Sequence, residues 1–313
     1  MSYDVKECAK RINPWIIKTP LVENENLSEI SGIKVYLKLE SMQRTGAFKF
    51  RGAMNYMLKL DKEAASKGVI TASSGNHGLG MSLSGKLNGI SCTVVMPVNA
   101  PLSKQNRAKE YGAEVILNGS CYDDAQEHAK ELSLKNNLTY VPSFNHPDII
   151  EGQGTILAEI LEEVPNVDMI VVPVGGGGML AGLLIAKDQL KSDVKIVGVE
   201  PVGAAGMKTS LENSSLYTVD KMDTIADGVA VRTPGEENFR IAKKYNPEIL
   251  TVDDKQIIEI QKSLFTKSKV IVETAGAVSV AGAIFNELPK DVKTVVCVIS
   301  GANLDLVQLK EYI

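Results

Sequence analysis

The sequence predicts an α/β protein with two doubly wound lobes, each a parallel sheet covered by helices. Short apolar stretches alternate with helical patterns along almost all of the 313 residues, which is typical of parallel sheets with helices on both faces. The strand–helix units also fall into two groups, one within residues 53–145 and the other in the remainder. We therefore expect a ligand between the lobes, at the carboxyl ends of strands.

The predicted small domain is 53–145, and the predicted large domain combines 1–52 with 146–313. The predicted strands are short and apolar: 35–39, 69–72, 91–96, 114–117, 169–172, 195–199, 249–252 and 294–299. The predicted helices have longer patterns of helical period: 48–60, 76–87, 102–111, 122–132, 152–163, 178–189, 253–265 and 276–285. The stretch 212–222 is the most loop-like part of the chain.

Composition excludes several classes of function. The net charge is −4 with no basic run, so nucleic acid is not an expected partner. The four cysteines, Cys8, Cys92, Cys121 and Cys297, are scattered without metal-ligand spacing, which suits a reducing cytoplasm. The N-terminus is polar, unlike a signal peptide, and no apolar run reaches the length of about 18 residues that indicates a membrane span.

Lys49 is the first candidate catalytic residue. It lies between Phe48 and Phe50, shortly after the predicted strand at 35–39. Desolvation beside aromatic rings lowers the pKa of a lysine, and a neutral amine can form a Schiff base with an aldehyde such as pyridoxal phosphate (PLP). Alone, the pattern favours an amphipathic helix with an exposed amine, so the interpretation depends on the turns described next.

Residues 73–78, Ser-Ser-Gly-Asn-His-Gly, form the first of these turns. They join a predicted strand to a predicted helix, so several backbone N–H groups converge at one point. Such a nest binds an anion, here a carboxylate, and the Asn76 amide could bond a ring hydroxyl. The same residues equally suit an ordinary helix N-cap with a turn.

Four consecutive glycines, Gly175, Gly176, Gly177 and Gly178, form the second turn. They follow a buried strand and precede a helix, and their backbone entropy cost makes a merely flexible loop a poor explanation. Bare backbone lets N–H groups surround a phosphate, and the helix dipole favours that charge. The third turn begins at Ser300, whose hydroxyl could bond a heteroaromatic nitrogen; in isolation it reads as an ordinary strand end.

Taken together and in order, these motifs resemble the fold-type II PLP enzymes (tryptophan synthase β-like), specifically the threonine/serine dehydratase and serine racemase branch. The resemblance spans the chain from 19 to 303. It implies that the cofactor lies in the cleft between the two lobes, and that the protein is a homodimer or homotetramer acting on a small amino acid. No membrane partner is implied.

The resemblance also implies roles for the residues singled out above. Lys49 carries PLP and acts as the base at the substrate Cα, while Phe48 packs beside the ring. Gly175, Gly176, Gly177, Gly178 and Met179 hold the phosphate through their N–H groups. Asn76 bonds the phenolic oxygen and Ser300 the pyridine nitrogen. The substrate carboxylate is gripped by Ser73, Ser74, Gly75, Asn76 and His77.

Within the family, the Asn76-His77 pair and the segments 144–155 and 225–232 resemble dehydratases. A neutral serine at the pyridine nitrogen makes the ring a weaker electron sink, which favours β-elimination over transamination. We expect a threonine/serine dehydratase of the catabolic type, without a regulatory domain. Ser74 leaves serine racemase open as the alternative, because racemases use a serine here as the opposite-face base. A non-catalytic PLP or amino-acid binding protein is the rival from another class.

A divalent cation (Mg²⁺ or Ca²⁺) is an uncertain further cofactor. Glu200 and the Ala204 carbonyl align with a cation site of many relatives, but Gly206 stands where the third, acidic ligand is expected. Glu200 also reads as an ordinary strand-end carboxylate. Glu151 replaces a residue that is usually small in the family.

Overall fold

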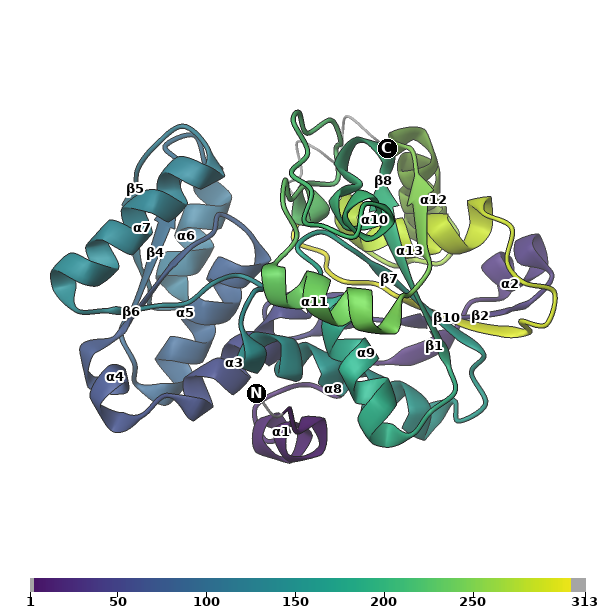
Figure 1. Cartoon of the computed structure of the whole chain (residues 1–313), viewed down its shortest axis with the longest axis horizontal. Helices are drawn as coiled ribbons and strands as arrows, with labels where there is room; N and C mark the ends of the chain where they lie inside the picture. The colour runs from purple at the N-terminus through teal and green to yellow at the C-terminus, as the bar shows by residue number, and fades with distance from the viewer. Residues whose placement is uncertain (1–2, 305–313) are drawn as a thin grey trace.

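The structure, a computed structural model, describes residues 3–304 (Figure 1). Expectations that concern residues 1–2 and 305–313 lie outside the described part. The described chain forms two lobes, each built on one sheet, as the sequence predicts. Among the described residues, no helix combines the length and the apolar character that crossing a membrane requires.

The large lobe contains a six-stranded sheet in the order β1-β2-β10-β7-β8-β9. Its strands are β1 (Leu21–Glu23), β2 (Lys34–Lys38), β7 (Met169–Pro173), β8 (Lys195–Pro201), β9 (Ile249–Val252) and β10 (Thr294–Val298). All neighbours pair in parallel except β1, which runs antiparallel to β2. Because β10 inserts between β2 and β7, an early strand and the last described strand pair within this sheet.

Helices cover both faces of the large sheet, since alternate residues of each strand point to opposite sides. Ile170 and Val172 of β7 pack in the cluster that contains residues of α8 (Pro147–Glu163), α9 (Gly178–Leu190) and α11 (Glu236–Tyr245). Met169 and Val171 pack on the other side, with α2 (Glu25–Ser31), α12 (Asp254–Thr266) and α13 (Thr274–Phe285). The strand is therefore apolar throughout, as a parallel strand buried on both faces must be.

The small lobe contains a four-stranded parallel sheet in the order β5-β4-β3-β6. Its strands are β3 (Val69–Ala72), β4 (Cys92–Met96), β5 (Glu114–Leu117) and β6 (Thr139–Tyr140). Its helices are α3 (Lys49–Lys59), α4 (Lys62–Lys67), α5 (Asn76–Asn88), α6 (Leu102–Glu110) and α7 (Tyr122–Asn136). This sheet draws its strands from a continuous part of the chain, inside the predicted small domain; the domain limits themselves stay a prediction.

The chain passes between the lobes through the packed helices α3 and α8. A Cβ at Gly152 would lie 2.5 Å from the Cα of Gly52, so the two helices touch backbone to backbone. The carboxyl ends of β3, β7 and β10 all lead into one cavity, described below. The lobes therefore meet where the sequence places the ligand.

Every predicted strand and helix forms, with shifted ends. Helix α8 begins at Pro147 rather than at 152, because proline suits the first helical position and the His146 ring accepts a hydrogen bond from the Asp148 N–H. The sequence missed several elements: α1 (Val5–Ile12), β1, α2, α4, β6, α10 (Gly206–Glu212), α11, and the 3-10 turns Glu40–Met42, Val202–Ala204 and Asp227–Val229. Most are too short to give a periodic signal.

Candidate functional site

A cavity of about 680 Å³ lies between the lobes, at the carboxyl ends of strands from both sheets. It collects every residue to which the sequence assigns a catalytic, cofactor-binding or substrate-binding role. These are Phe48, Lys49, Ser73, Ser74, Gly75, Asn76, His77, Gly175, Gly176, Gly177, Gly178, Met179 and Ser300. They come from turns far apart in the sequence. These turns meet in one cavity because the carboxyl ends of parallel strands lie at the same edge of a sheet.

Lys49 and Ser300 are held together by their backbones. The Phe48 N–H donates to the Ser300 carbonyl at 3.0 Å, and Ala47 forms an antiparallel bridge with Gly301. Lys49 is the first residue of α3, directly after this pairing. The end of β10 thus fixes where the lysine enters the cavity.

The ε-amine of Lys49 lies in an apolar setting. Its Nζ donates to the Ser143 carbonyl at 2.9 Å and lies 5.4 Å from the Phe48 ring centroid and 5.7 Å from that of Phe144. Burial lowers the pKa of Lys49 from 10.5 to about 8. The amine can therefore lose its proton near neutral pH, which an exposed lysine cannot.

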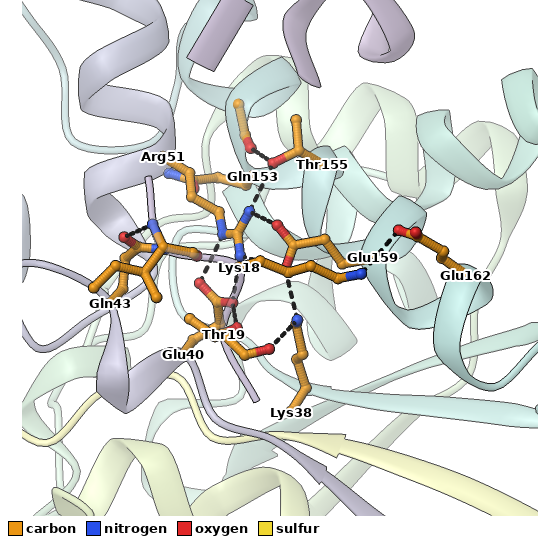
Figure 2. A network of polar contacts seen from close by, with 12 residues as sticks. Lys18, Thr19, Lys38, Glu40, Gln43, Arg51, Gln153, Thr155, Glu159 and Glu162 are labelled. Carbon is orange, nitrogen blue, oxygen red and sulfur yellow. Dashed lines mark hydrogen bonds and ion pairs between the residues drawn. The ribbon is translucent and has the colours of Figure 1, made fainter. Parts of the chain in front are cut away.

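A buried network of ion pairs, here called the buried ion network, holds the first turn of α3, the helix that begins at Lys49 (Figure 2). Figure 2 shows the Arg51 guanidinium between two carboxylates, those of Glu40 and Glu159. Arg51 Nε and Nη2 donate to Glu40, both at 2.8 Å, and Nη1 and Nη2 donate to Glu159 at 2.6 and 2.9 Å. Nη1 also donates to the Thr155 hydroxyl at 3.3 Å. Arg51 therefore joins the first turn of α3 to the segment after β2 and to α8.

The network also balances its charges. Lys38 Nζ donates to Glu159 at 2.6 Å and to the Thr19 carbonyl at 2.7 Å, while the Thr19 hydroxyl donates to Glu40. Burial alone would lower the pKa of Arg51, but Glu40 and Glu159 more than offset this and raise it. Two cations thus face two carboxylates, and each carboxylate has a cationic partner.

The loop of residues 73–77 precedes α5 as the sequence predicts. Gly75 is its N-cap residue, with no capping side chain, and the Ser73 hydroxyl accepts a hydrogen bond from the Gly75 N–H at 3.2 Å. The first N–H groups of α5 have no partner within the helix. They lie at the N-terminal end of α5, and this end borders the cavity. Burial, and then the charge of Lys49, lowers the pKa of His77 to about 3, so this imidazole is neutral.

The glycine turn is tightly enclosed. A Cβ at Gly176 would lie 2.4 Å from the Phe144 ring, and one at Gly175 would lie 2.8 Å from the Val229 Cα. Gly177 has a φ of +88° and caps α9 without a side-chain hydrogen bond. A side chain at Gly175, Gly176 or Gly177 would therefore displace its neighbours, and the first N–H groups of α9, beside the cavity, have no partner within the helix.

Asn76 has partners that the sequence did not reveal. Its Nδ2 donates to Glu273 Oε1 and its Oδ1 accepts from Asn303 Nδ2, both at 2.7 Å. Burial raises the pKa of Glu273. Ser143, Glu273 and Asn303 also line the cavity. The resemblance places Glu273 near the cofactor ring, although an ordinary helix N-terminal carboxylate fits this position equally well, and Asn303 lies in the motif that begins at Ser300. Ser143 was not singled out from the sequence, and the contacts of all three depend on the tertiary fold.

The possible cation ligands lie outside the residues that line this cavity. Both Glu200 oxygens already accept backbone hydrogen bonds at 2.8 Å, from the N–H groups of Met207 and Lys208. Burial raises the pKa of Glu200 to about 7. Ala204 ends a 3-10 turn, and Gly206 offers no side-chain ligand. Within residues 3–304, no group of three or more His, Cys, Asp or Glu side chains is arranged to hold a metal.

Known proteins are similar to this chain along most of its length. A family model described as pyridoxal-phosphate dependent enzyme matches residues 12–301. An L-threonine ammonia-lyase of Thermotoga maritima is 41% identical over 97% of this chain and 75% of its own length. A processed threonine deaminase of Solanum lycopersicum superposes with a TM-score of 0.92 at 37% identity, covering 99% of this chain and 88% of its own. A serine racemase of maize gives 0.94 at 33%, covering 98% and 94%.

Proposed function

The chain belongs to the family of pyridoxal-phosphate dependent enzymes, and on that premise we propose that it is an ammonia-lyase for L-threonine and L-serine. The reaction removes the Cα proton and the β-hydroxyl, and water then hydrolyses the resulting enamine to a 2-oxo acid and ammonia. The observation that carries the proposal is the meeting of Lys49, the glycine turn and Ser300 in one cavity.

The residues present fit PLP. The glycine turn offers open N–H groups at the start of α9 for a phosphate, and Lys49 offers an amine with a pKa of about 8 for the aldehyde. Ser300 is 4% exposed, at the end of β10, where its hydroxyl can meet the ring nitrogen. When bound, PLP withdraws electrons from the substrate Cα.

The chain supplies positioning and proton transfer. We propose that Lys49 Nζ accepts the Cα proton, held by the Ser143 carbonyl and by its apolar surroundings. The N–H groups at the start of α5, with Ser73, Ser74 and Gly75, bind the substrate carboxylate. Ser300, being neutral, cannot hold a proton on the ring nitrogen as a carboxylate would, which favours release of the β-hydroxyl over transamination.

Serine racemase activity is the second candidate. Ser74 lines the same cavity as Lys49, and the fold is closely similar to that of a plant serine racemase. A hydroxyl on the opposite side of Cα from Lys49 would return a proton to give the D-enantiomer. Both activities begin with the same proton abstraction, so one site can perform both.

Three further properties concern assembly, location and metal binding. We propose a homodimer or homotetramer, which sedimentation analysis would test and a monomer would contradict. We propose a cytoplasmic location, consistent with Cys8, Cys92 and Cys297 being buried and unpaired. A divalent cation at Glu200 and Ala204 stays a prediction on which the mechanism does not depend.

The deciding experiment replaces Lys49. Lys49→Ala removes both the attachment point and the base, so 2-oxo acid release should fall by at least roughly 10²- to 10⁴-fold. Release from L-threonine and L-serine is measured together with D-serine formation by chiral analysis. Rapid release with little D-serine supports the ammonia-lyase; dominant D-serine supports the racemase. Wild-type protein that binds PLP but yields neither product would support the non-catalytic alternative, and substantial turnover by Lys49→Ala would contradict the assignment.

A further inference from the structure

We propose that Arg107 and Asn303 are positioning residues that set the orientation of the Asn76 amide in the cavity. They form a hydrogen-bond chain from Arg107 through Asn303 to Asn76. The inference deepens the proposed function and rests on it, because Asn76 is the group expected to meet the phenolic oxygen of PLP.

The first link of the hydrogen-bond chain fixes Asn303. Arg107 Nη1 donates to Asn303 Oδ1 at 2.6 Å. A guanidinium has donors and no acceptor, so the oxygen of the Asn303 amide must face Arg107 and its NH₂ group must face away. That NH₂ group donates to the Thr45 carbonyl at 2.8 Å and to Asn76 Oδ1 at 2.7 Å. A flipped Asn303 would oppose donor to donor and oxygen to oxygen at every one of these contacts.

The second link fixes Asn76. Because its Oδ1 accepts from Asn303, its NH₂ group points the other way, where one hydrogen is donated to Glu273 Oε1 at 2.7 Å. Glu273 is fixed in turn, since its Oε2 accepts from the Asn303 backbone N–H at 3.0 Å. One N–H of Asn76 then remains to be donated within the cavity. A flipped Asn76 would present an oxygen there, which would repel a phenolate.

Two glycines leave the space that the hydrogen-bond chain needs. A Cβ at Gly46, which has a φ of +76°, would lie 2.6 Å from Asn303 Oδ1. A Cβ at Gly301 would lie 2.6 Å from Glu273 Oε1 and 3.1 Å from Asn76 Nδ2. The cluster is therefore packed closely enough to hold each amide in one orientation.

The hydrogen-bond chain also crosses between the lobes. Arg107 lies on α6 and Asn76 begins α5, both in the small lobe, while Asn303 follows β10 and Glu273 caps α13 in the large lobe. Asn76 is correctly oriented only while both lobes contribute their parts. The position of the small lobe thus controls a contact to the cofactor.

The test is a double-mutant cycle of Arg107→Met and Asn303→Ala, read out by the PLP dissociation constant and the visible absorption spectrum of the bound cofactor. Arg107→Met keeps the side-chain stem and removes the donor, so Asn303 can flip, and the dissociation constant should rise roughly five- to tenfold. Asn303→Ala should have at least the same effect. Adding Arg107→Met to Asn303→Ala should change nothing further, because the hydrogen-bond chain is already broken.

The matched control is Lys109→Met, which removes an exposed cation from the same helix and should leave PLP affinity and spectrum unchanged. Arg107→Lys restores a donor and should recover most of the affinity. An Arg107→Met effect that persists in full on top of Asn303→Ala would overturn the proposal, since it would show that the charge acts at a distance. An unchanged affinity and spectrum in Arg107→Met would overturn it as well.

If Arg107→Met does not fold, Asn303→Asp decides the question. Aspartate keeps an oxygen for Arg107 but loses the NH₂ group, so affinity must fall in a folded protein, and an unchanged affinity refutes the proposal. Wild-type protein that binds no PLP would instead contradict the proposed function itself, which keeps the two failures distinct.

Discussion

The side chain of Lys49 owes its chemistry to what surrounds it. Within residues 3–304, its ε-amine forms no ion pair with a carboxylate; it contacts the Ser143 carbonyl and lies over the rings of Phe48 and Phe144. Burial disfavours the ammonium form, so the pKa falls to about 8. The consequence is measurable before any substrate is added.

Capture of PLP by the apoprotein should follow the ionisation of Lys49. Only the neutral amine attacks an aldehyde, so the capture rate should rise with pH and level off above about 8, not near the ordinary lysine value of 10.5. The appearance of the visible absorption band in stopped-flow mixing gives the rate. Lys49→Ala is the control for reaction at surface lysines, and a rate that continues to climb beyond pH 10 would show that Lys49 is not desolvated.

Ser74 separates the two candidate activities. Ser74→Ala should lower D-serine formation by roughly 10²- to 10⁴-fold, the usual effect of losing a general acid or base, and leave 2-oxo acid release nearly unchanged. Ser73→Ala is the matched comparison: its hydroxyl bonds the Gly75 N–H, so its loss should affect both products alike. Loss of elimination in Ser74→Ala would assign Ser74 to substrate binding instead.

The site residues that the sequence singled out all line one cavity, although their roles stay predictions and their partners were not foreseen. Turn residues such as Gly177 and Ser74 have local signatures, because backbone geometry and helix caps are local properties. Ser143 had no such signature, and Glu273 fitted a family position near the cofactor ring and an ordinary helix N-terminal carboxylate equally well. The contacts of Ser143 with Lys49 and of Glu273 with Asn76 arise only when distant parts of the chain meet.

At the scale of elements, the buried ion network fixes α3 to α8 and to the end of β2. Arg51 and Glu40 are fully buried, and the Glu159 side chain is only 13% exposed. Replacing one member leaves a buried charge without a partner, which costs far more than the pair itself contributes.

Arg51→Met should therefore destabilise the protein by roughly 3–5 kcal/mol, measured by urea unfolding. Lys18→Met is the matched control, because Lys18 pairs with Glu162 at the surface, where such a pair contributes little to stability. If Arg51→Met lowers the free energy of unfolding no more than Lys18→Met does, the prediction is wrong. That result would mean that water hydrates the carboxylates of Glu40 and Glu159 when Arg51 is absent.

Helix and strand assignments were most successful where the pattern was long or the strand buried on both faces. Strand β7 and helix α9 are examples, since continuous apolar stretches next to glycine mark them clearly. Helix α11 was missed although it spans Glu236–Tyr245. Its buried face is narrow, with Phe239, Ile241 and Ala242 among mostly charged residues.

At the scale of the whole molecule, the structure explains why a glutamate stands at position 151, where the family usually has a small residue. Its carboxylate is buried and accepts the Asp4 N–H at 2.7 Å and the Asn55 amide at 3.0 Å. The cations of Arg11 and Lys59 both lie 3.5 Å away. Glu151 thus joins the N-terminal segment to both helices by which the chain passes between the lobes.

Glu151→Ala should cost roughly 2–4 kcal/mol in thermal or urea unfolding, because the buried Asn55 amide and the Asp4 N–H lose an acceptor and Arg11 loses its ion pair. Glu151→Gln should cost less, since an amide oxygen can still accept one of these hydrogen bonds. Hydrogen exchange in α1 should increase first. Glu162→Ala, at the exposed side of α8, is the control, and equal effects of the two alanine variants would contradict the joining role of Glu151.

The sequence predicted two lobes because strand–helix alternation is visible locally. It could not predict the strand order, since β10 takes its place between β2 and β7 through contacts between opposite ends of the chain. Such pairings have no local signature.

The position of β10 has a consequence for biosynthesis. The ribosome releases the whole of β3 to β6 early, so the small sheet can form while the rest of the chain is still being made. Strand β2, which emerges before it, must wait for one of the last described segments before its inner edge is covered. Pairing between segments so far apart in the sequence is slow to form, so we expect the uncovered β2 edge to be a site of aggregation risk during translation.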